Sequence, residues 1–122
     1  MIISIGAERA QKLIDFLIRK FVTNKGRPIT IKNYTIMPKF AVVEVGKYVK
    51  HRLILYTFTE RLLRMRCKSI VFDVRGLKNN LVTQVEITDD GDVIVLPDRD
   101  KKAVDDFIHA IESHYACERQ KA

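Results

Sequence analysis

The chain has 122 residues, of which 47% are hydrophobic and 30% charged, with five Gly and three Pro. This composition excludes a disordered or fibrous chain and predicts a single folded domain over residues 1–122. No apolar run approaches the roughly 20 residues of a membrane helix, so we expect a soluble, cytoplasmic protein. The two cysteines, Cys67 and Cys117, stand outside any paired spacing, which argues against a disulfide scaffold or a zinc ribbon.

Charge is distributed unevenly along the chain, whose formal net charge is +7. Residues 1–82 hold 17 Lys and Arg against five Asp and Glu, whereas residues 83–122 hold five against ten. An excess of +12 in the first two thirds indicates a polyphosphate or acidic partner. Enrichment in Lys and Arg for solubility alone is the competing interpretation.

The first forty residues predict a strand, a helix and a second strand. An apolar strand at residues 2–5 precedes Gly6, which permits the backbone turn into a helix. Apolar residues at helical spacing extend from Ala7 to about Thr23, and alternation predicts a strand from Pro28 to Tyr34.

A weak repeat of this order follows. The strand Val42–Val45 precedes Gly46, a helical pattern extends from Tyr48 to about Met65, and the β-branched strand Lys68–Val74 closes at Arg75-Gly76. Each copy therefore predicts strand, Gly, helix and strand.

Beyond Gly76 the pattern predicts a β-hairpin and a last helix. Strands at Leu81–Ile87 and Val93–Leu96 flank a turn that contains Asp90-Gly91. Pro97 ends the hairpin, and one apolar face of helical spacing follows: Val104, Phe107, Ile108, Ile111 and Tyr115. We therefore expect an α/β (α+β) fold, a two-layer sandwich with helices covering one mixed sheet, in the order β-α-β-β-α-β-β-β-α.

Both predicted internal helices carry a stripe of cations. On the first, we expect one exposed ring among four cations: Arg9, Lys12, Phe16, Arg19 and Lys20. On the second, the aligned cations include Lys50, Arg61 and Arg64. Each cation that meets a phosphate displaces a condensed counterion, so two such ridges can bind nucleic acid without base readout. A charged stripe also keeps any surface helix in water, which is the alternative.

Two further segments place polar groups where nucleic acid can be contacted. A predicted loop from Lys32 to Phe40 interleaves cations with rings, including Tyr34 and Lys39, and such rings suit stacking on bases. Tyr34 and Phe40 can equally close the core. After Arg75-Gly76, a turn at Lys78-Asn79-Asn80 offers a cation and amides for phosphate contacts.

The segment Ala41–Lys47, a helix, and Ser69–Gly76 together resemble the first half of the Alba family of archaeal and eukaryotic DNA- and RNA-binding proteins, over about 36 of the 122 residues. The resemblance implies that Lys47 faces nucleic acid, that Arg75-Gly76 leads into a second helix, and that a homodimer forms. Here Leu77–Leu81 leads toward a hairpin instead. A ferredoxin-like β-α-β-β-α-β core is the rival, in which Lys39–Val45 resembles the third-strand motif of an RNA recognition domain.

Signals for catalysis are weak. The sequence contains no Gly-rich phosphate loop, nucleophile elbow or paired-Cys motif, so we expect no catalytic residues and no cofactor. His114 and Cys117 share a helix face, but a zinc site needs three or four ligands, so no metal is expected. Turn and helix-cap roles account for five aspartates that could otherwise hold Mg²⁺: Asp89, Asp90, Asp92, Asp98 and Asp100.

The leading hypothesis is a small non-enzymatic protein that binds the phosphate backbone of DNA or RNA. Its expected contact residues are Arg9, Lys12, Arg19, Lys20, Tyr34, Lys39, Lys47, Lys50, Arg61, Arg64, Arg75 and Lys78. The first alternative is an interaction subunit that docks an acidic protein through Phe16, Tyr34, Phe40 and the last helix. The second is a metal-dependent nuclease that needs Asp90 and Asp92.

Overall fold

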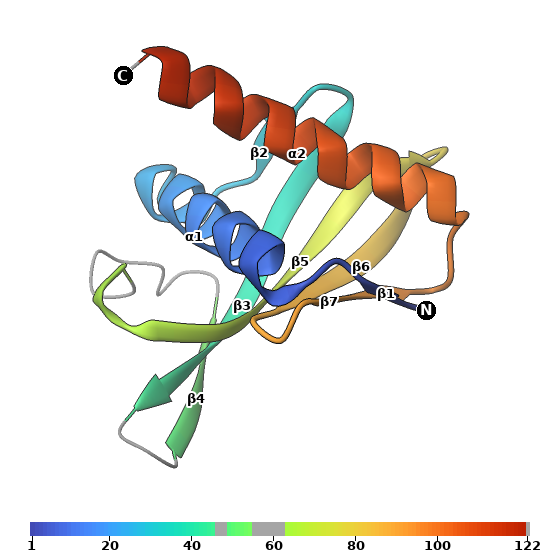
Figure 1. Cartoon of the computed structure of the whole chain (residues 1–122). Coiled ribbons are helices and arrows are strands. Elements are labelled where there is room, and N and C mark those ends of the chain that lie inside the picture. Colours follow the sequence, from blue (N-terminus) through green and yellow to red (C-terminus); the bar gives the residue numbers. More distant parts are fainter. Residues whose placement is uncertain (46–48, 55–62, 122) are drawn as a thin grey trace.

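The computed structural model describes residues 1–45, 49–54 and 63–121. Within these ranges the elements are β1 (Ile2–Ser4), α1 (Ala7–Thr23), β2 (Ile29–Ile31), β3 (Tyr34–Val45), β4 (Val49–Ile54), β5 (Arg66–Lys78), β6 (Leu81–Thr88), β7 (Asp92–Leu96) and α2 (Lys101–Lys121) (Figure 1).

The strands form one sheet in the order β1-β7-β6-β5-β3-β2, and β4 also pairs with β3. β5 runs along one side of β3, from Thr35 opposite Arg75 to Glu44 opposite Arg66. On the other side of β3, β2 pairs with its first three residues and β4 with its second half. The long pair β3–β5 is therefore the centre of the sheet, and it carries bulges near Lys39 and between Val42 and Val43.

Every pairing between the described strands is antiparallel, so the expectation of a mixed sheet is wrong. The helix expected from Tyr48 to Met65 is also wrong, because residues 49–54 form β4 and pair with β3, with His51 opposite Val43. Cross-strand pairing of this stretch with β3 outweighs its helical spacing. Residues 46–48 and 55–62 lie outside the described residues. The observed order is thus β-α-β-β-β-β-β-β-α.

Other predicted elements are confirmed, with changed boundaries. The helix Ala7–Thr23, the hairpin of β6 and β7, and the last helix all form. The predicted loop from Lys32 to Phe40 is wrong, because only Lys32 and Asn33 form a turn and β3 begins at Tyr34. β5 continues past Gly76 because this residue, at φ 110°, accommodates a bulge inside the strand.

Aromatic rings join both helices to the same face of the sheet. The ring of Phe72 in β5 lies 6.3 Å from that of Phe21 in α1 and 6.2 Å from that of Phe107 in α2. Phe107 also meets Tyr34 edge-on, at 4.9 Å. In Figure 1 both helices lie over one side of the sheet. The core therefore lies between this face and the helices.

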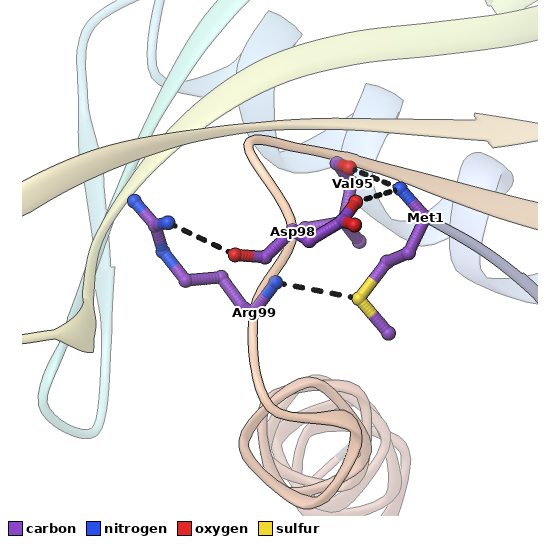
Figure 2. A network of polar contacts seen from close by, with 4 residues as sticks. All are labelled: Met1, Val95, Asp98 and Arg99. Atoms are coloured by element: carbon purple, nitrogen blue, oxygen red, sulfur yellow. Dashed lines mark hydrogen bonds and ion pairs between the residues drawn. The ribbon is translucent and has the colours of Figure 1, made fainter.

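The start of the chain is fastened to the strand beside it. The Met1 ammonium donates a hydrogen bond to the Val95 carbonyl at 2.8 Å and pairs with Asp98 (Figure 2). The backbone N–H of Arg99 donates to the Met1 sulfur, and the Arg99 side chain donates to the buried Thr83 hydroxyl at 3.0 Å. These contacts hold β1 against β7 and fix the segment that leads into α2.

We expect Phe107→Ala to lower the free energy of unfolding by about 3–5 kcal/mol, because it leaves a cavity between Tyr34 and Phe72. Urea denaturation monitored by circular dichroism measures the change. Lys101→Ala, at an exposed position of the same helix, serves as the control and should change stability by less than about 0.5 kcal/mol. Equal effects of the two substitutions would contradict this description of the core.

Candidate nucleic-acid interface

The cation stripe predicted on α1 faces the second half of α2. Phe16 was expected to be an exposed ring, but only 6% of it is accessible. It packs against His114 at 6.0 Å and Tyr115 at 5.3 Å, measured between ring centroids. Because α2 lies alongside α1, the face that the sequence indicates as polar is partly covered.

Two of the four cations on α1 are neutralised by α2. Arg9 donates to both carboxylate oxygens of Glu112, from Nε at 2.8 Å and from Nη2 at 2.7 Å. This bidentate bond raises the pKa of Arg9 and lowers that of Glu112. Lys20 forms an ion pair with Glu118, and its hydrogen bond lowers the pKa of Glu118. Arg9 and Lys20 are therefore charge-compensated within the fold.

The other two cations of α1 are more accessible. Lys12 is exposed and lies 3.4 Å from Glu8, one turn earlier, which is a weak surface pair. Arg19 is exposed and, with Lys12, borders a hollow of about 370 Å³ between the two helices. Asp15 and Glu118 also line this hollow, so its charge is mixed.

The second helical ridge does not exist as predicted. Lys50 belongs to β4, and Arg64 lies in a short 3₁₀ turn just before β5, where it is exposed. Lys47 and Arg61 lie outside the described residues. Arg19 and Leu63 line one hollow, which brings Arg64 into the neighbourhood of α1.

A group of three exposed cations gathers where two turns of the sheet adjoin. We call this group, Lys32, Arg75 and Lys78, the cationic edge. Arg75 lies opposite Thr35 in the β3–β5 pair, and Lys78 ends β5. A side chain at Gly76 would place its Cβ 2.7 Å from the Asn33 carbonyl oxygen, so β5 closely approaches the turn that carries Lys32. Across the described parts of the chain, no carboxylate lies within ion-pair distance of these three cations.

Tyr34 and Lys39 have partners within the fold. Tyr34 is half-buried against Phe107, and burial raises the pKa of its hydroxyl. Lys39 donates to the side-chain oxygen of Gln84 at 3.2 Å, across the face of the sheet away from the helices. Tyr34 is consequently a core contact, and neither it nor Phe16 offers the open ring expected of a docking or stacking residue.

The groups considered for catalysis do not converge in the structure. Of the five aspartates, Asp89 pairs with Lys68 at 3.1 Å and Asp98 with the Met1 ammonium. Over the described residues, no three His, Cys, Asp or Glu side chains come together as a metal site. Burial raises the pKa of the Cys67 thiol to about 12, so it stays protonated at neutral pH, whereas Cys117 is exposed.

Comparison with known proteins does not identify a family for the chain. It matches no protein-family model, no curated protein and no solved structure. In the described part of the chain, no helix is long and apolar enough to cross a membrane.

Sequence reasoning named Arg75 and Lys78 as contact residues, whereas it named Lys32 only as the first residue of a predicted loop with cations and rings. Residues 28–34 were interpreted as one strand, whereas Lys32 and Asn33 form a turn between two short β-branched runs. The Lys-Asn pair is the signal for this turn, since Asn favours turns. Neither the strand predicted to end at Tyr34 nor the loop predicted from Lys32 to Phe40 placed Lys32 near Lys78.

The Arg9–Glu112 bond gives a pH-dependent prediction. The depressed pKa of Glu112 means that the bond stabilises the fold above the ordinary Glu pKa of about 4.3, and that this contribution is lost as pH falls through the lower folded-state pKa. We expect Glu112→Gln to lower the free energy of unfolding by about 1 kcal/mol at neutral pH and to have little effect in acid.

Urea denaturation across this pH range measures both effects. Asp106→Asn, which breaks the exposed pair of Asp106 with Lys102, serves as the control and should change stability by less than about 0.5 kcal/mol. A pH-independent effect of Glu112→Gln would rule out the ion pair as its cause.

Proposed function

We propose that the protein binds nucleic acid through the cationic edge, mainly by contacts to the phosphate backbone. The observation that carries the proposal is the convergence of Lys32, Arg75 and Lys78 from adjoining turns, all exposed and without a carboxylate partner among the described residues. Because these cations form no ion pair with a described carboxylate, none has to break before they contact a phosphate. Each phosphate contact releases a condensed counterion, which favours binding at low salt.

The surroundings of the cationic edge suit a phosphate backbone more than stacked bases. Asn33 and Asn79 are exposed beside the three cations and can donate amide hydrogen bonds to phosphate or sugar oxygens. Gly76 has no side chain to keep a ligand away from the strand. The rings named in the sequence hypothesis, Phe16 and Tyr34, pack against α2. We therefore expect binding that depends little on sequence.

The cations of α1 play a secondary part in this proposal. Arg9 and Lys20 would have to exchange a formed ion pair for a phosphate, which cancels much of the gain. Lys12, Arg19 and Arg64 are exposed and contribute to the positive potential that attracts a polyanion from a distance.

The experiment compares two triple variants that remove the same charge. Lys32→Gln, Arg75→Gln and Lys78→Gln together neutralise the cationic edge, while Lys12→Gln, Arg19→Gln and Arg64→Gln neutralise the flank of α1. Fluorescence anisotropy with labelled single- and double-stranded DNA and RNA is measured over a series of salt concentrations. We expect the first variant to weaken binding roughly tenfold or more and to reduce the slope of log affinity against log salt by about 2–3.

The α1-flank variant should lose less affinity, because it changes only long-range attraction. Equal losses in the two variants would contradict the assignment of binding to the cationic edge. Failure of the unmodified protein to bind any of the oligonucleotides, or binding that ignores salt, would overturn the proposed function itself.

A further inference from the structure

The cationic edge contains two short hairpin turns of the same length. Lys32 and Asn33 alone connect β2 to β3, and Asn79 and Asn80 alone connect β5 to β6. Because β3 and β5 are antiparallel neighbours, both turns lie at the same end of the sheet. Residues at equivalent positions of the two turns can therefore be compared directly.

The first residue of each turn has a left-handed backbone conformation. The backbone angle φ is 52° at Lys32 and 51° at Asn79. The favoured hairpin turns of two residues have a positive φ at this position, where Gly, Asn and Asp predominate. Asn tolerates the conformation because its short side chain bonds to the nearby backbone, which the long side chain of Lys does not do. Asn79 therefore suits its turn, whereas Lys32 is strained in the equivalent position.

A third residue other than glycine with a positive φ, Lys25 at 57°, has a structural explanation. It directly follows Asn24, the C-cap of α1, and helices commonly end in a left-handed residue. The partial negative charge of the last helical carbonyl groups also attracts its ammonium. Lys32 follows a strand, so this explanation does not apply to it. Within the described residues, no carboxylate lies within ion-pair distance of Lys32 either.

The surrounding structure leaves the β2–β3 turn little room to relax this strain. A Cβ at Gly76 would lie 2.7 Å from the carbonyl oxygen of Asn33, so the backbone of β5 already closely approaches the turn. Tyr34, the residue after the turn, packs edge-on against Phe107 at 4.9 Å between ring centroids. A strained conformation persists where its surroundings fix it in this way.

We propose that Lys32 is kept in the β2–β3 turn to contact phosphate, at the expense of the stability of the fold. Strained residues gather at binding sites, where function offsets the stability that they cost. Lys32 is exposed and adjoins two further exposed cations, Arg75 and Lys78. Asn in place of Lys32 would suit the turn better and would remove a phosphate contact. The fold and the ligand therefore favour different residues at this position.

This inference rests on the proposed function, because the role that it assigns to Lys32 is a contact with the nucleic-acid backbone. The strain does not depend on a ligand, however, so its effect on stability is measured without nucleic acid. Stability and affinity are therefore two separate measurements on the same variants.

The experiment compares three single variants that remove the same charge: Lys32→Asn, Lys78→Asn and Lys25→Asn. Urea denaturation monitored by circular dichroism gives the stability of each variant. Fluorescence anisotropy with labelled single-stranded RNA and double-stranded DNA gives its affinity.

Lys32→Asn should raise the urea midpoint of unfolding and weaken binding about fivefold near 0.15 M salt, which is roughly the effect of one released counterion. Lys78→Asn should also weaken binding but should not raise the midpoint, because Lys78 has no positive φ. Lys25→Asn should change the affinity by less than about twofold, since β2 and the loop before it separate Lys25 from the cationic edge.

The inference is overturned if Lys32→Asn does not raise the midpoint, or if it raises the midpoint and still binds as tightly as the unmodified chain. A loss of affinity in Lys25→Asn as large as that in Lys32→Asn would also overturn it, because the loss of charge alone would then explain both. Failure of the unmodified chain to bind either oligonucleotide would instead overturn the proposed function, and with it the role of Lys32 in binding. An unchanged midpoint of Lys32→Asn with intact binding by the unmodified chain would overturn this inference alone.

Discussion

The packing of Phe72 against a ring from each helix determines which surfaces of the molecule remain open. Because Phe21 of α1 and Phe107 of α2 meet the same strand residue, both helices must lie on one face of the sheet. The second half of α2 then lies along α1 and buries Phe16. On the opposite face of β1, β6 and β7, aliphatic side chains remain exposed. The cations in the turns at the end of β5 also remain exposed.

The docking of α2 on α1 also shows that part of the charge excess along the chain is paired within the fold. The basic first two thirds and the acidic last third are brought together where α2 meets α1, and Glu112 and Glu118 neutralise Arg9 and Lys20. Part of the excess charge therefore stabilises the docking of the helices. The charge that remains open to a ligand lies where carboxylates are distant, above all at Lys32, Arg75 and Lys78. A count of cations along a helix does not distinguish cations that are paired within the fold from cations that are open to a ligand.

Local periodicity predicted α1, the β6–β7 hairpin and α2, because each has a strong pattern of its own. It failed for β4, whose helical spacing was real but whose pairing with β3 is a tertiary effect. The burial of Phe16 could not be predicted either, since it depends on where a helix about a hundred residues later docks. For the candidate site, Arg75 and Lys78 were predicted individually, but their convergence with Lys32 depends on the β3–β5 register.

The most direct test of the account is a nuclear magnetic resonance titration of the isotope-labelled protein with a short oligonucleotide, because it reports the contact surface residue by residue. We expect the changes in backbone amide shift to concentrate at Lys32 and Asn33 and between Arg75 and Asn80, while the shifts of α1 change little. Shifts concentrated along α1 from Arg9 to Lys20, with the cationic edge unchanged, would contradict it.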